Sequence, residues 1–218
     1  PEIEYVEVVP TEGELAGKRV ILGKARLEAY AKELGTDSPE ELVVRTFLGS
    51  ELAGRRYQPI FPYFADREDD EAPGPNAFQV LNADYVTTED GTGLVHLAPA
   101  FGEDDMLACQ AAGIKPVVPV DDGGKFDSQV PDYEGTQIFD ANRLILADLR
   151  EGTGPLAAIP ASRRAVLVKQ ASYQHSYPHC WRCHKPIIFR ATEQWFCSIS
   201  KFREDVYKAI DTVTWMPD

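Results

Sequence analysis

The 218-residue sequence predicts a mixed α+β fold: strands dominate a barrel-like sheet, short helices lie beside it, and a connective segment follows at the C-terminal end. Two observations lead to this class. Segments with strand-like patterns outnumber segments with helical spacing, and they do not alternate with helices in the regular order of a parallel α/β sheet. Apolar residues make up 44% of the chain, which is enough for a sizeable core.

The N-terminal part of the chain contains clear strand signals. Residues 4–9, EYVEVV, alternate in polarity and predict a half-buried strand, and residues 18–22 predict a second strand after a turn. Residues 24–35 space apolar side chains at helical intervals and predict a helix that ends at a glycine. Residues 38–49 begin with Ser-Pro and continue into β-branched residues, which predicts a helical turn leading into a strand.

The middle of the chain predicts more strands, separated by turns rich in glycine and proline. Asp90-Gly91 is typical of a hairpin turn, and residues 65–76 predict an acidic surface loop. Asp140 is expected to cap a clear amphipathic helix. The elements expected here are strands within 49–64, 78–99 and 115–120, and helices at 103–113 and 140–152.

A change in charge divides the chain into a body, residues 1–160, and a return segment, residues 161–218. The return segment has nine Lys/Arg and five Asp/Glu, a net charge of +4, whereas the body carries −17. The two parts are therefore expected to face different neighbours. The elements expected in the return segment are strands within 163–183 and 185–199 and a helix at 200–213.

Composition excludes several classes of function. The net charge of −13 argues against a surface that coats nucleic acid, because phosphate contacts need Lys and Arg, so any such contact is expected to be local. The chain has no long apolar run, so no membrane span is expected. Four cysteines are too few for a disulfide scaffold and indicate a reducing cytoplasm. The N-terminus has neither an initiator methionine nor a signal pattern, which is typical of a segment of a longer chain.

The stretch GTGLVHLAPAFGEDD, residues 91–105, contains the main candidate site. If residues 94–98 form a strand, His96 lies on one face of it, and a buried histidine needs a polar partner. Three acids follow at the expected start of a helix, where free amides and the helix dipole favour carboxylates. Capping alone explains such acids, but three adjacent carboxylates repel one another unless one has another purpose.

A histidine and a carboxylate that converge on one pocket suit either of two tasks. They can bind a ligand with an ammonium group, or they can hold a water molecule for hydrolysis. No serine or cysteine nucleophile is indicated, because the chain has no Gly-x-Ser-x-Gly elbow and Cys109 lies within the expected helix.

The sequence HCWRC, residues 179–183, forms a cysteine knuckle in which Cys180 and Cys183 have the C-x-x-C spacing of zinc ligands. One such pair supplies only half of the four ligands of a structural zinc site. The alternative is two cysteines that pack within a β-turn. The further candidate ligands, which are weaker, are His175, His179, His184 and Cys197.

Residues 91–105 closely resemble the editing-site signature of the isoleucyl-tRNA synthetases. The resemblance extends to residues 49–64, 82–93 and 176–196, which are similar to blocks found in that order in this family. It implies an editing domain that is inserted into the catalytic Rossmann body. This domain is expected to hydrolyse the ester of valine wrongly attached to tRNA(Ile), or valyl-adenylate. The expected partners are the amino-acid-bearing end of tRNA(Ile) and the remainder of the synthetase chain.

The resemblance also implies roles for individual residues. Asp105 matches the acid that holds the α-ammonium of the substrate, and His96 matches the residue that lines the side-chain pocket, so that valine enters and isoleucine does not. Catalysis then consists mainly of orienting a water molecule against the ester, without a covalent intermediate. The other expected substrate-binding residues are Gly91, Thr92 and Gly93 in the turn, Gly102 beside the terminal adenosine, and Asp104.

The chain departs from the family pattern in what it lacks. A threonine-rich segment that lines the opposite wall of the pocket is expected to precede residue 1. The adenylate-binding HIGH and KMSKS motifs are absent, so ATP is expected to be used only by the catalytic domain. A second C-x-x-C, also N-terminal, is expected to complete a zinc site with Cys180 and Cys183 in the parent enzyme.

Two other functions stay open at this point. One is the editing domain of a valyl- or leucyl-tRNA synthetase, although the sequence of the loop APAFGEDD argues against this alternative. The other is a protein-interaction module built around the cysteine knuckle, in which His96 and Asp105 are unrelated surface groups.

Overall fold

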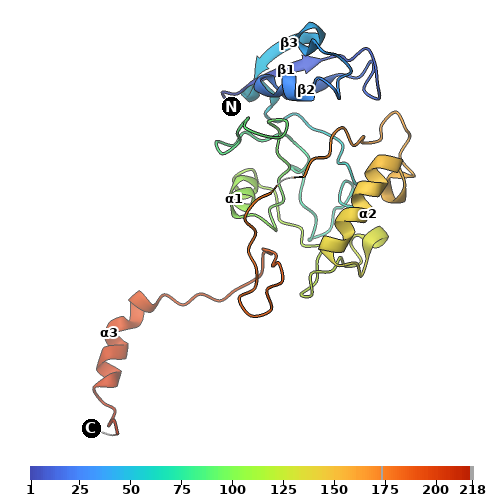
Figure 1. Cartoon of the computed structure of the whole chain (residues 1–218). Coiled ribbons are helices and arrows are strands. Elements are labelled where there is room, and N and C mark those ends of the chain that lie inside the picture. The colour runs from blue at the N-terminus through green and yellow to red at the C-terminus, as the bar shows by residue number, and fades with distance from the viewer. Residues whose placement is uncertain (173, 217–218) are drawn as a thin grey trace.

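The structure, a computed structural model, describes residues 1–172 and 174–216. Figure 1 shows the sheet at one end of a body that also contains the first two α-helices, whereas the third lies far from this body at the end of an extended segment. The elements are β1 Glu4–Val8, β2 Val20–Gly23, β3 Val43–Leu48, α1 Glu103–Ala111, α2 Ile138–Glu151 and α3 Ile199–Ile210.

The three strands form one antiparallel sheet in the order β2-β1-β3. Alternate side chains of β1 point to opposite faces, and both faces are covered. Val6 and Val8 belong to a buried cluster on one face, and Tyr5 stacks on Phe47 with ring centroids 6.3 Å apart on the other. The buried Tyr5 hydroxyl also donates a hydrogen bond of 2.6 Å to the carbonyl of Gly93.

The predicted strands at 4–9 and 18–22 are confirmed by β1 and β2, and the helical turn leading into a strand by η3 (Pro39–Leu42) and β3. The helix predicted at 24–35 is wrong. Two short 3₁₀ turns, η1 (Lys24–Arg26) and η2 (Glu28–Tyr30), begin this segment, and the amides of Leu27, Tyr30 and Ala31 bond three residues back instead of four. Packing of Leu27 and Leu34 against the sheet overrides their helical spacing.

The expected barrel-like sheet is not confirmed, because the structure shows a small open sheet of three strands. The strands predicted within 49–64, 78–99, 115–120 and the return segment do not form among the described residues. Proline cannot donate to a ladder, and it lies within 49–64, 115–120 and the return segment, whereas 78–99 has it only at its last residue. The contacts that remain are isolated bridges: Arg56 with Gln79, Val120 with Phe126, Lys125 with Gln137, and His179 with Pro186.

Two of the predicted helices in this part of the chain are present. The one predicted at 103–113 is α1, and the one predicted at 140–152 is α2, which begins two residues earlier. Asp140 does not cap α2, so that prediction is wrong. The side chain of Gln137 instead accepts a hydrogen bond of 2.7 Å from the Phe139 amide, and Gly152 ends the helix with φ of +70°.

The predicted helix at 200–213 is also present, as α3. The extended segment before it contacts the body through Ala191, whose amide donates a hydrogen bond of 2.7 Å to the Ala100 carbonyl. Arg190 donates to the Val120 carbonyl at 2.9 Å and pairs with Asp122. Among the described residues, no helix combines the length and apolarity needed to cross a bilayer.

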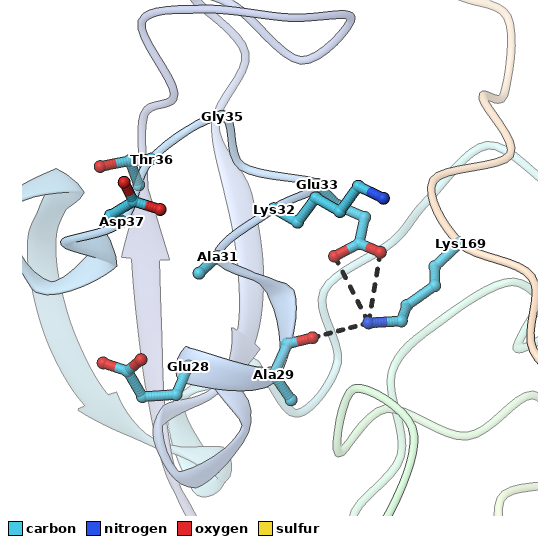
Figure 2. Close-up of a pocket in the computed structure, with 9 residues that line it drawn as sticks. All are labelled: Glu28, Ala29, Ala31, Lys32, Glu33, Gly35, Thr36, Asp37 and Lys169. Carbon is cyan, nitrogen blue, oxygen red and sulfur yellow. Dashed lines mark hydrogen bonds and ion pairs between the residues drawn. The ribbon is translucent and has the colours of Figure 1, made fainter.

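Lys169 of the return segment contacts Ala29 and Glu33, in the segment that follows β2, as Figure 2 shows. Its Nζ donates to the Ala29 carbonyl at 2.6 Å, lies 3.2 Å from a carboxylate oxygen of Glu33, and lies 4.8 Å from the centre of the Tyr30 ring. These contacts border an open depression of about 560 Å³. None of the residues expected at the functional site lines this depression.

Removal of the Tyr5 hydroxyl by Tyr5→Phe is expected to lower the free energy of unfolding by about 1 to 2 kcal/mol, because the Gly93 carbonyl loses its buried donor. Urea denaturation of the chain measures the change. The matched control is Tyr207→Phe on the exposed face of α3, for which a change below about 0.5 kcal/mol is expected. Equal changes in the two variants would contradict the structural importance of this bond.

Candidate functional site

The turn at residues 91–93 is held in place by the sheet. The Gly23 amide at the end of β2 donates a hydrogen bond of 2.7 Å to the Thr92 carbonyl, and Tyr5 of β1 donates to Gly93. Gly93 has φ of +79°, in the left-handed region, and a Cβ there would lie 3.4 Å from the Gly23 Cα, an ordinary contact distance. Glycine is therefore favoured at position 93 by the backbone angle.

Arg26 holds the same turn from the side. Its guanidinium donates to the Glu89 carbonyl at 2.9 Å and to the Gly91 carbonyl at 3.0 Å. The Thr92 hydroxyl lies 3.3 Å from the Leu94 amide and fixes the exit of the chain. The turn therefore has a defined position although the residues after it belong to no ladder.

His96 is exposed, and the predicted strand at 94–98 does not form. The prediction that His96 lies on a core strand and needs a buried partner is therefore wrong. Its imidazole makes no hydrogen bond within residues 1–172 and 174–216, so both ring nitrogens are available to a ligand. Leu94 and Val95 before it are exposed as well.

Asp105 stands in the first turn of α1 with two other acids, Glu103 and Asp104, both exposed. Its side chain does not cap the helix. Instead it folds back toward the preceding loop, where Oδ2 accepts a hydrogen bond of 2.9 Å from the Ala98 amide. The carboxylate lies over Gly102, where a Cβ would approach Oδ2 to 3.0 Å, so a larger residue at 102 would displace it.

Tyr85 approaches the other oxygen of this carboxylate, and sequence reasoning missed it. Its hydroxyl lies 3.4 Å from Oδ1 of Asp105. Partial burial raises the pKa of Tyr85, and the negative charge of Asp105 raises it further, so the phenol keeps its proton. The block NADYVTTEDGTG contains Tyr85, but nothing in its spacing indicates a contact with a residue twenty positions later.

Cys109 lies one helical turn after Asp105 on the same face of α1 and is buried. Burial raises the pKa of its thiol, and the charge of Asp105 adds to this effect. The thiol is therefore neutral and a poor nucleophile.

The structure brings Asp105, Gly102 and Tyr85 together, and the turn at 91–93 begins the loop that contains His96. No Lys or Arg in the described part of the chain forms an ion pair with Asp105. Its carboxylate is thus oriented by neutral donors and keeps its charge available to a cation. Such a group can bind a primary ammonium.

The cysteine knuckle forms a separate tight turn. The Cys180 amide donates to the Lys185 carbonyl and the His184 amide to the Cys180 carbonyl, both at 2.8 Å. The amides of Cys183 and Arg182 and the Cys183 thiol all lower the pKa of Cys180, which favours the thiolate that a metal requires. The donor set is incomplete, however, because no three His, Cys, Asp or Glu side chains gather to hold a metal among the described residues.

Comparison with known proteins extends over the entire chain. It is 52% identical over 219 residues to an isoleucine–tRNA ligase of Bifidobacterium longum, covering 99% of this chain and 20% of that protein. Isoleucine–tRNA ligases of Corynebacterium diphtheriae and Mycobacterium tuberculosis are 50% and 46% identical over 220 and 218 residues, covering 100% of this chain and 19% of each protein. No model of a protein family matches.

The chain therefore spans about a fifth of the length of these relatives. The similarity includes the turn, the loop and the knuckle, since it covers practically every residue of the chain. Over its whole length, the chain is similar to one segment of the isoleucine–tRNA ligases.

Proposed function

We propose that this chain is the editing domain of an isoleucine–tRNA ligase and hydrolyses the ester that links valine to tRNA(Ile). The observation that supports this most is the Asp105 carboxylate, which lies over Gly102 without a Lys or Arg partner in the described residues. His96, in the loop that precedes α1, is exposed and is proposed as a second ligand-binding group. The family of the relatives supports isoleucine rather than valine or leucine as the cognate amino acid.

An isoleucine–tRNA ligase needs such an activity for a physical reason. Valine is one methylene smaller than isoleucine, so it enters any pocket that accepts isoleucine. This enzyme is the standard example of one in which binding alone discriminates too little, so that a second, smaller site destroys the wrong product. A site that excludes isoleucine by size and binds the shared α-ammonium meets this requirement.

The proposed mechanism assigns one task to each residue. Asp105 binds the α-ammonium of the valyl group, and the His96 ring limits the length of the side chain that fits. Water attacks the ester carbonyl, and free valine and the ribose hydroxyl of the terminal adenosine are released. The gain in rate comes mainly from the orientation of the ester and the water. The other proposed substrate contacts are Gly91, Thr92, Gly93, Gly102 and Asp104.

The remaining activities of the ligase are proposed for other parts of the protein. ATP is used by the catalytic domain, and tRNA(Ile) and the rest of the ligase are the partners of this segment. Fully exposed aromatic side chains at Trp195 and Phe196, and apolar residues on α3, support a role of the return segment in contacts outside the chain.

Zinc is proposed for the complete ligase only. Cys180 and Cys183 would supply two thiolates, and the lowered pKa of Cys180 suits this role. A structural zinc ion takes four ligands, and the other two are proposed to come from elsewhere in the complete ligase. The ion would stabilise the knuckle and takes no part in the proposed hydrolysis.

Asp105→Asn is expected to slow the hydrolysis of valyl-tRNA(Ile) by about 30-fold or more, because the anchor of the ammonium loses its charge. The asparagine side-chain oxygen can still accept the hydrogen bond from the Ala98 amide, so the loop keeps its conformation. Release of labelled valine by the complete ligase measures the rate.

The matched control for this charge change is Glu103→Gln, which removes an exposed acid from the same helical turn and should leave the rate unchanged. Asp105→Ala is expected to slow the hydrolysis more than Asp105→Asn does, because alanine also loses the contact with the Ala98 amide. An Asp105→Asn ligase as active as the wild type would refute the proposed role of this carboxylate.

His96→Ala is expected to enlarge the side-chain pocket, so that the domain begins to hydrolyse correctly charged isoleucyl-tRNA(Ile). The ratio of the valyl to the isoleucyl rate should fall by at least about tenfold, the lower end of what one methylene contributes to discrimination. Val95, the preceding residue, is also exposed, and Val95→Ala is the control, which should leave the ratio of the two rates unchanged. An unchanged ratio in His96→Ala would remove this residue from the size-selective wall.

Cys180→Ser and Cys183→Ser are each expected to lower the zinc content of the purified complete ligase, while Cys197→Ser, an exposed cysteine outside the knuckle, leaves it unchanged. Elemental analysis gives the metal content per protein. A full complement of zinc in both knuckle variants would show that these thiols are not ligands.

A further inference from the structure

The two oxygens of the Asp105 carboxylate are held by different neighbours. Oδ2 accepts a hydrogen bond of 2.9 Å from the Ala98 amide, a backbone donor that only a substitution to proline would remove. Oδ1 faces the Tyr85 hydroxyl at 3.4 Å, which is longer than the roughly 2.5–3.0 Å usual for an O–H···O hydrogen bond. The amide fixes one oxygen only, so the plane of the carboxylate depends on the second contact.

The Tyr85 hydroxyl is suited to be a permanent donor to this carboxylate. Tyr85 is 40% exposed, so its hydroxyl lies at the edge of the site and not in the core. The raised pKa of Tyr85 keeps the proton on the phenol at neutral pH. A contact of this length in a protein without ligand commonly shortens when the charged ligand binds.

The other groups near Asp105 are not suited to donate a hydrogen bond to its Oδ1. Asp104 is exposed and carries the same charge, so it cannot donate. Cys109, on the same face of α1, is neutral and is a weak donor. No Lys or Arg pairs with Asp105 in the part of the chain that the structure describes. Tyr85 is thus the side chain that can orient Oδ1 without neutralising it.

We infer that Tyr85 is a positioning residue, which turns the Asp105 carboxylate toward the α-ammonium of the bound aminoacyl group. This inference rests on the proposed function. A neutral phenol fixes the direction of the carboxylate and leaves its full charge for the ligand, whereas a Lys or Arg at this place would compete with the ammonium. In this role, Tyr85 affects the binding of the α-ammonium and not the binding of the valine side chain or of the adenosine.

Two stable ligands test this role in the complete ligase. One is adenosine that carries valine through an amide at the ribose, and the other is the same compound without the α-amino group. Tyr85→Phe is expected to weaken binding of the first compound about fivefold, as for the loss of one hydrogen bond, and to leave binding of the second unchanged. Calorimetry gives both affinities.

Tyr57→Phe is the matched control. Tyr57 is another partly exposed tyrosine near Cys109, and it makes no contact with Asp105. It should leave both affinities unchanged. In an Asp105→Asn ligase, Tyr85→Phe should no longer weaken the binding of the first compound, because the group through which it acts has lost its charge.

Two results would overturn the role of Tyr85 alone. Equal weakening for both compounds would show that Tyr85 shapes the pocket, and unchanged binding of both would show that it does nothing there, provided that Asp105→Asn weakens the first compound. If the wild-type ligase binds both compounds equally and Asp105→Asn has no effect, the proposed function fails and the role of Tyr85 fails with it.

Discussion

The buried hydrogen bond from the Tyr5 hydroxyl to the Gly93 carbonyl is the contact on which the geometry of the candidate site depends. Together with the bonds from Gly23 and Arg26, it attaches the turn at 91–93 to the edge of the sheet. The loop that follows has no ladder of its own. Without this attachment, the start of the loop that contains His96 would have no fixed position relative to the sheet.

Asp105 combines a structural and a proposed functional task in one side chain. Its bond to the Ala98 amide closes the loop against α1, and its uncompensated charge is offered to the ligand. A substitution that removes the whole carboxylate abolishes both the charge and the bond to the Ala98 amide. Asparagine removes the charge but keeps an oxygen for this bond, so it separates the two effects. Gly102 belongs to the same arrangement, because any Cβ there would press on the carboxylate.

The features that sequence predicted correctly are local ones. Alternation in residues 4–9 and the apolar face of α2 depend on residues close in the chain, whereas strand pairing requires a partner that the sequence does not name. Residues 94–98 have a strand pattern but no neighbour to bond with. Residue types and the family resemblance predict a site in the stretch 91–105, whereas neither indicates Tyr85 or Tyr5, because their contacts span 20 and 88 positions.

The loop between the turn and α1 is held at three places by three parts of the chain. The sheet binds its start at residues 91–93, Asp105 binds Ala98 in its middle, and the Ala191 amide of the return segment binds the Ala100 carbonyl near its end. Each bond fixes a different backbone group, so none can substitute for another. The return segment is therefore part of the scaffold of the site up to Ala191, and beyond it the exposed residues through α3 contribute nothing to that scaffold.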